Sequence, residues 1–166
     1  IGFIALALSV TAFQVNKRKR ILILMGSGNL FWALHFYLVG AFTGSAMNGL
    51  AIFRNYLFIK YRDKFSGYKL PLIFILMFSA AAIITCQGPI SLLPFIGMAT
   101  GTLAFWQKNP KYIRMISLLS PPAWFLHNFI QESYPGMMIE VFIFCSILIA
   151  IFRYDILGHP EKAVAN

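Results

Sequence analysis

Long apolar runs, separated by short polar segments, recur along the whole 166-residue chain. Each run approaches the roughly 20 residues that an α-helix needs to cross a hydrocarbon core of about 30 Å. Hydrophobic residues make up 59% of the chain and charged residues 11%, which is more apolar surface than a water-soluble domain of this length can bury. Seven runs are predicted to span a membrane: residues 1–15, 21–39, 44–60, 71–86, 89–106, 113–130 and 136–153.

Backbone amides find no water in hydrocarbon, so these segments must satisfy their hydrogen bonds internally and are predicted to be helices. The expected fold class is therefore an all-α polytopic membrane protein. The basic segment "NKRKR" follows the first run, whereas a signal peptide carries its basic residues before the apolar part. Residues 1–15 are thus expected to form a membrane helix, and the chain is expected to begin inside it.

Basic residues gather in alternate connections between the runs, whereas "AFTGS", "QGP" and "ESYPG" contain no Lys or Arg. The positive-inside rule places the basic connections in the cytoplasm, with the N-terminus outside and the C-terminus inside, and this requires an odd number of spans. Anionic lipid headgroups then explain the net charge of +9, and no nucleic-acid partner is expected. The basic residues in and beside these connections and at the C-terminal end are Lys17, Arg18, Lys19 and Arg20; Lys60, Arg62, Lys64 and Lys69; Lys108, Lys111 and Arg114; and Arg153 and Lys162.

The pattern Trp-x-Leu-His occurs twice, 92 residues apart. Runs one to three match runs five to seven, with one run between them, so the second unit keeps the orientation of the first and the repeat is parallel. The matched pairs are His35 and His127, Trp32 and Trp124, Gly44 and Gly136, Asp63 and Asp155 and, with an offset of 93, Gln14 and Gln107. The predicted units are a first three-helix bundle (1–63), a linker loop with the fourth helix (64–88), a second bundle (89–155) and a cytoplasmic tail (156–166).

The 3+1+3 pattern, with a glutamine ending the first helix of each unit and a tryptophan in the second, resembles the SWEET and PQ-loop superfamily of small-solute carriers. More narrowly, "FQVNKRKRILIL", "LHFYLVGAFTGSAMN" and "FRN" are similar to the bacterial inner-membrane YgjV family. The resemblance implies a bacterial inner-membrane protein whose two bundles rock about a central site. One departure is that Phe13 and Trp106 stand where the superfamily has the proline of its Pro-Gln signature.

A hinge is therefore expected elsewhere. Pro121 and Pro122 lack amide donors and clash with the preceding turn, so the sixth run should kink or break. Gly26 and Gly28 lower helix rigidity at the corresponding place in the second run. Interrupted helices at matched positions indicate a gating hinge at a midplane site; the alternative is a static kink that only improves packing. Gln14 and Gln107 are grouped with these candidate gating residues.

Each Trp and His pair shares one helix face, since its members are three residues apart. Indole and imidazole rings offer stacking surfaces and hydrogen bonds that suit a planar or sugar-like solute. Ionisable groups inside membranes usually face a cavity, although the repeat could preserve these side chains for packing alone. The predicted substrate-binding residues are Trp32, His35, Asn48, Trp124, His127 and Asn128.

Two charged residues within the runs are candidates for coupling or gating. Arg54 lies about ten residues into the third run and is expected either to line the site or to snorkel to the cytoplasmic face. Glu140 is the repeat match of Asn48, so the two halves of the site are not equivalent, and its alternative position is near the outer surface. A proton taken up by Glu140 or a histidine would make transport proton-coupled.

These features predict a transporter or facilitator of a small polar solute such as a sugar, nucleoside or vitamin. An enzyme is not expected, because Met25 breaks the Gly-x-Ser-Gly spacing of a rhomboid-type protease and no His, Cys or Asp cluster has zinc spacing. No metal or cofactor is expected. The partners expected are the solute, the lipid bilayer and either a second copy of the chain or another membrane protein. The alternative function is a non-transporting membrane subunit or assembly factor that keeps a carrier-like fold.

Overall fold

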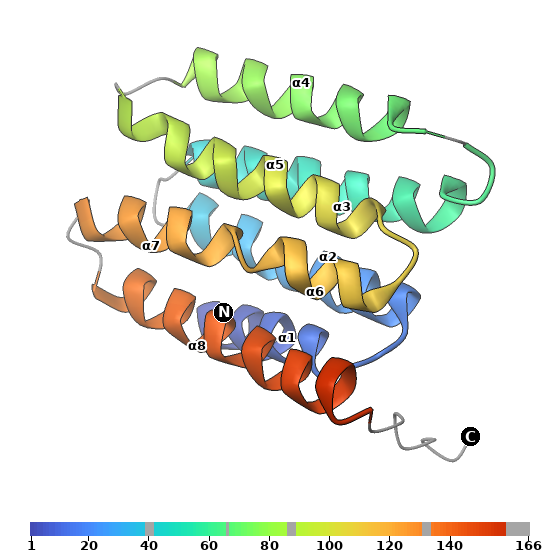
Figure 1. Cartoon of the computed structure of the whole chain (residues 1–166). Helices are drawn as coiled ribbons and strands as arrows, with labels where there is room; N and C mark the ends of the chain where they lie inside the picture. Colours follow the sequence, from blue (N-terminus) through green and yellow to red (C-terminus); the bar gives the residue numbers. More distant parts are fainter. Residues whose placement is uncertain (39–41, 66, 86–88, 131–133, 159–166) are drawn as a thin grey trace.

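A computed structural model describes residues 1–38, 42–65, 67–85, 89–130 and 134–158 (Figure 1). This part of the chain contains helices and no strand, which confirms the all-α class. The elements are α1 (Gly2–Phe13), α2 (Arg18–Leu38), α3 (Phe42–Tyr61), α4 (Lys69–Ile84), the 3-10 turn η1 (Pro89–Ser91), α5 (Leu92–Trp106), α6 (Pro110–Ser117), α7 (Ser120–Ile130), α8 (Tyr134–Ala150) and the π-helical turn η2 (Ile151–Ile156).

Two stretches of described helix, Arg18–Leu38 and Gly136–Ile156, are long and apolar enough by themselves to cross a membrane. α1, α4 and α5 are shorter apolar helices. Apolar side chains also cover much of the outer surface of the molecule, as expected where lipid rather than water is the neighbour. On α4, for example, Ile83 and Ile84 are 74% and 82% exposed, whereas Phe74 and Phe78 are buried against the neighbouring helices.

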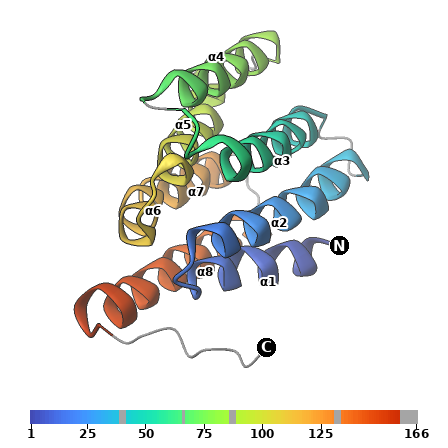
Figure 2. The same ribbon diagram turned by 90° about the vertical axis from the view of Figure 1, so that its right-hand side faces the viewer.

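The helices lie side by side as two three-part units with α4 at one edge (Figures 1 and 2). In the first unit α2 packs between α1 and α3; in the second α7 contacts both α5 and α8, while α6 contacts α5. Across the units, α1 packs on α8 and α3 packs on α5. The first helix of each unit thus contacts the last helix of the other, which is the arrangement that a twofold axis between parallel repeats produces.

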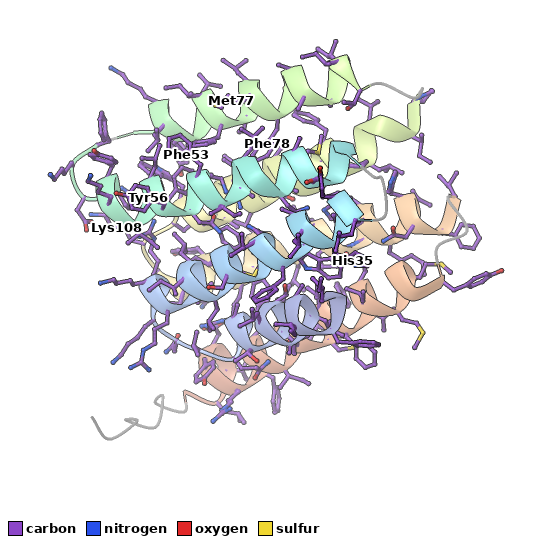
Figure 3. All side chains as sticks on the ribbon, turned by 180° about the vertical axis from the view of Figure 1, so that it is seen from behind. His35, Phe53, Tyr56, Met77, Phe78 and Lys108 are labelled. Carbon is purple, nitrogen blue, oxygen red and sulfur yellow. The ribbon has the colours of Figure 1, made fainter. Side chains whose placement is uncertain are left out.

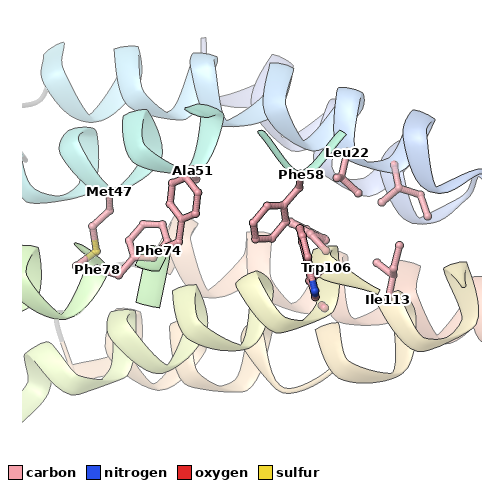
Figure 4. Close-up of a cluster of buried hydrophobic side chains, with 11 residues drawn as sticks. Leu22, Met47, Ala51, Phe58, Phe74, Phe78, Trp106 and Ile113 are labelled. Carbon is pink, nitrogen blue, oxygen red and sulfur yellow. The ribbon is translucent and has the colours of Figure 1, made fainter. Parts of the chain in front are cut away.

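The larger buried cluster lies where α3, α4 and α5 meet (Figure 4). Phe58 packs edge-to-face on Phe74 and on Trp106, with ring centroids 5.7 and 4.8 Å apart. Such pairs contribute roughly 0.5–1.5 kcal/mol beyond the area they bury. This packing holds α4 against the second unit as well as the first.

The predicted break in the sixth run is confirmed. α6 ends at Ser117 and α7 begins at Ser120, so Pro121 and Pro122 fall in the first turn of α7, where a missing amide donor removes no helical hydrogen bond. The prolines therefore start a new helix rather than kink a continuous one.

α2 runs without interruption from Arg18 to Leu38, so the second run shows no helix break at Gly26 and Gly28 that would match the break in the sixth run. Gly28 lets α2 approach α1, because a Cβ there would lie only 3.1 Å from the Ser9 hydroxyl. A Cβ at Gly26 would lie 3.8 Å from the Asn55 side chain of α3, which is an ordinary contact. The absence of a side chain thus serves helix packing at Gly28.

The connections α1–α2, α3–α4 and α5–α6 lie at one end of the molecule, which we call the basic end because it carries Lys17, Lys64 and Lys108 (Figures 1 and 3). His35 lies toward the opposite end (Figure 3). The three connections meet in space, since Arg18 donates hydrogen bonds to the carbonyls of Gln107, Phe105 and Phe58. The basic connections that alternate along the sequence are thus gathered at the basic end of the fold.

Candidate solute-binding cavity

A cavity of about 760 Å³ lies between the two units. The two matched ring pairs line it with nearly the same geometry. The ring centroids of Trp32 and His35 are 5.8 Å apart at 79°, and those of Trp124 and His127 are 5.9 Å apart at 87°. The repeat is therefore expressed in side-chain arrangement as well as in helix order, and both pairs face one shared space.

The structure brings all six predicted substrate-binding residues to this cavity, together with Arg54, Glu140 and Pro121. The other predicted hinge and gating residues lie outside its lining: Gly26, Gly28, Pro122, Gln14 and Gln107.

Gln14 and Gln107 end their helices alike. Their backbone N–H groups donate to the backbone carbonyls of Thr11 and Ala104, which are also 93 residues apart. Their side chains differ. The Gln14 amide group donates to the Ser146 carbonyl and hydroxyl of α8, whereas that of Gln107 bonds within its own helix and to the Tyr68 hydroxyl. Of the two, Gln14 joins the two units at the basic end.

Arg54 does not snorkel to the cytoplasmic face. Its side chain is 2% exposed and lines the cavity. The guanidinium donates to the Asn55 amide oxygen and the Thr102 hydroxyl, and it lies 5.1 Å from the centre of the Phe105 ring. Among the described side chains, no carboxylate lies within ion-pair distance of it. Neutral partners therefore hold a full positive charge in the interior.

Glu140 is half-buried and lines the cavity rather than the outer surface. Its repeat match, Asn48, donates a hydrogen bond of 2.8 Å to the Gly44 carbonyl within its own helix. No described side chain forms an ion pair with Glu140. Since Asn48 and Glu140 both line the cavity, the two halves of the site carry an amide and a carboxyl group at matched positions.

Matched glycines make room for cavity side chains. A Cβ at Gly44 would lie 2.9 Å from the Phe36 ring, and one at Gly136 would lie 2.6 Å from the Asn128 side chain. The two glycines are repeat matches, 92 residues apart, and so are Phe36 and Asn128. Gly97, the first glycine of "GMATG", gives the same room to the Trp124 indole. These glycines let helices approach closely while a large side chain occupies the gap.

Replacing Gly97 with alanine is expected to displace Trp124 and lower the free energy of unfolding by about 1–3 kcal/mol, the usual cost of overpacking. The added Cβ would lie 2.6 Å from Cδ1 of the indole, which cannot be accommodated without movement. Thermal unfolding in detergent micelles checks this result. The control is Gly49→Ala, because a Cβ at Gly49 meets no atom within 4 Å and should stabilise its helix slightly. Equal effects of the two substitutions would contradict the packing account.

Sequence reasoning did not single out Ser117 or Phe36. Phe36 stacks on Trp32 with centroids 5.7 Å apart, and the buried Ser117 hydroxyl lines the cavity without a described hydrogen-bond partner. Ser117 is matched by Met25, so the repeat gives no signal for it. The sequence indicates Ser117 only as a polar residue inside an apolar run, four residues before Pro121.

Among the described residues, the hydrogen bonds between the two units lie from the level of Arg54 to the basic end. Ser146 donates to the Val10 carbonyl and Tyr154 to the Gln14 carbonyl, over 2.8 and 2.6 Å. Arg62, the repeat match of Tyr154, donates to the Trp106 carbonyl. The cavity is thus closed toward the basic end by two symmetry-related sets of bonds.

The fold and cavity together define a polytopic α-helical membrane protein with two related three-part units around a central cavity. A family model for bacterial inner membrane proteins, Imp-YgjV, matches residues 1–156, so the chain belongs to this family and to the bacterial inner membrane. It is 26% identical over 140 residues to inner membrane protein YgjV of Escherichia coli (strain K12), which covers 84% of this chain and 74% of that protein. No solved structure matches the chain.

Proposed function

We propose that the protein carries a small polar solute across the inner membrane by alternating access of its central cavity. The observation that supports this most is the pair of matched Trp and His side chains lining one cavity between two units. Its volume, about 760 Å³, lies in the range of sites that enclose small ligands. A structural subunit has no need of polar groups directed into a space between its halves, since polar groups inside a membrane protein are costly.

The closure of the cavity at one end fits such a cycle. The bonds made by Ser146, Tyr154 and Arg62 hold the two units together at the basic end. Rocking of one unit against the other would break these contacts and open that end. The proposal takes the basic end as cytoplasmic by the positive-inside rule, with the N-terminus outside and the C-terminus inside, and in that orientation the closed end faces the cytoplasm.

Uptake into proteoliposomes tests the proposal with a panel of sugars, nucleosides and vitamins. We expect uptake of at least one solute class, and we expect His35→Ala and His127→Ala each to lower it about tenfold, the effect of losing roughly 1.4 kcal/mol of binding. Both histidines line the cavity, so each substitution removes a hydrogen-bonding group that meets the solute.

The matched controls are Leu34→Ala and Leu126→Ala. These repeat-related residues neighbour the two histidines but are 45% and 46% exposed on the outer surface. They should leave uptake unchanged. Loss of uptake in the leucine variants to the same extent as in the histidine variants would point to a folding effect. An absence of uptake across the panel would favour the non-transporting subunit or assembly factor.

A further inference from the structure

The Arg54 guanidinium is held in one orientation yet keeps unused donors. Nε and Nη2 both donate to the Asn55 amide oxygen over 3.1 Å, and Nη1 donates to the Thr102 hydroxyl over 3.0 Å. A guanidinium has five N–H groups, so two have no acceptor among the described residues. Since Arg54 lines the cavity, its free donors are available to a bound molecule.

A further donor without a partner among the described residues lies near the depth of Arg54. The buried Ser117 hydroxyl lines the cavity. Ser117 matches Met25, whose neighbour Gly26 lies next to the Asn55 side chain, so the repeat places the hydroxyl near the level of Arg54. Buried polar groups are nearly always hydrogen-bonded. A carboxylate or phosphate supplies an acceptor for this hydroxyl and for Arg54, and charge-assisted bonds to arginine are among the strongest.

Glu140 lies at a different depth. The repeat match of Arg54 is Ser146, six residues beyond Glu140 on α8, so the two charged residues differ in depth by about 9 Å at the helical rise of 1.5 Å per residue. The level of Glu140 is nearer the end that carries His35. Trp32 and Trp124 line the same cavity, and indole faces attract cations. A carboxylate in a cavity that tryptophan rings also line is suited to a cationic group.

Among the described residues of the cavity lining, Arg54 and Glu140 are the only Arg, Lys, Asp or Glu side chains, and they do not form an ion pair. An isolated charge in a membrane interior is costly unless a partner compensates it. A neutral sugar would compensate neither residue, whereas a molecule with opposite charges at its two ends compensates both.

We propose that the solute is dipolar, with an anionic group bound by Arg54 and Ser117 and a cationic group bound at Glu140. The inference rests on the proposed function only in treating the bound molecule as the transported one. It names a solute class that differs from neutral sugars and nucleosides.

Calorimetric titration of the purified protein in detergent tests the proposal with four compounds of similar size. They are 4-(aminomethyl)benzoate, which is dipolar; 4-methylbenzoate, which is anionic; 4-methylbenzylamine, which is cationic; and 4-methylbenzyl alcohol, which is neutral. The dipolar compound should bind at least about tenfold more tightly than each of the others, because it alone meets both charges.

Substitutions then assign each end. Arg54→Gln should lower the affinity for the dipolar compound to the affinity for the cationic compound. Glu140→Gln should lower the affinity for the dipolar compound to the affinity for the anionic compound. Circular dichroism and thermal unfolding check that each variant is folded. If Arg54→Gln fails to fold, Arg54→Lys keeps the charge but removes the planar fork, and it should weaken carboxylate binding while leaving the cationic compound unaffected.

Equal affinity for the neutral and dipolar compounds, no binding of any of the four, or unchanged selectivity in both variants would overturn the dipolar site. Selective binding without flux of 4-(aminomethyl)benzoate into proteoliposomes would keep the site and reject transport. Flux of neutral solutes with no charge selectivity would keep transport and reject the dipolar site. The two proposals can therefore fail separately.

Discussion

Replacing Asp155 with asparagine is expected to lower the free energy of unfolding by about 3–5 kcal/mol, because it leaves a buried arginine without its counter-ion. Arg114 of α6 is 1% exposed and Asp155 of η2 is 7% exposed, and their closest nitrogen and oxygen atoms are 2.5 Å apart. A second bond of 2.9 Å joins Nε of Arg114 to the other carboxylate oxygen. The Asn16 side-chain oxygen accepts from Nη1 and Nη2, so the guanidinium also ties the α1–α2 connection to the second unit.

The repeat supplies a matched control for this prediction. Asp63 is the counterpart of Asp155 and lies 3.1 Å from Lys108, but the two side chains are 84% and 62% exposed. The Lys108 ammonium lowers the pKa of the Asp63 carboxyl below its ordinary value through their hydrogen bond. Water screens this pair, so Asp63→Asn should leave stability nearly unchanged. Unfolding in detergent micelles, followed by circular dichroism, compares the two variants, and similar losses would contradict the buried-pair account.

A disulfide between the two units at the basic end is expected to abolish uptake. Ser146 donates its hydroxyl hydrogen bond directly to the Val10 carbonyl, so the side chain at residue 146 lies against the α1 backbone. Cysteines at these two positions, in a background with Cys86→Ser and Cys145→Ser, should be within reach of a disulfide. The oxidised protein would hold the basic end closed and could not complete the transport cycle.

Reduction of the same sample serves as the main control, since it should restore uptake without a change of sequence. The single variants Val10→Cys and Ser146→Cys show whether either substitution harms transport alone. Undiminished uptake by fully oxidised protein would show that the basic end need not open.

The repeat allowed much of the site to be predicted. An offset of 92 residues pairs Trp32 with Trp124 and His35 with His127, and matched helices place matched side chains around one axis. The prolines located the break between α6 and α7, because a missing amide excludes Pro121 from a helix interior but not from a first turn. Both predictions rest on features that the chain carries locally.

Other features depend on which face each helix turns toward its neighbours, and an apolar run does not indicate which face that is. Membrane helices are apolar on the lipid side as well as the packed side, so no pattern shows that Arg54 faces inward. Ser117 has an apolar repeat match and was not singled out. Gly26 and Gly28 resemble a flexible segment in sequence, and only the nearness of Ser9 shows that Gly28 serves close packing.

Labelling of a single cysteine at Ser117 tests most directly whether the cavity opens to both sides of the membrane, and it requires no knowledge of the solute. Ser117 lines the cavity and is 3% exposed. In a background with Cys86→Ser and Cys145→Ser, alternating access predicts that a membrane-impermeant thiol reagent reaches this cysteine both from the outer face and, in inverted vesicles, from the basic face. Labelling from one face alone, or from neither, would contradict a carrier cycle.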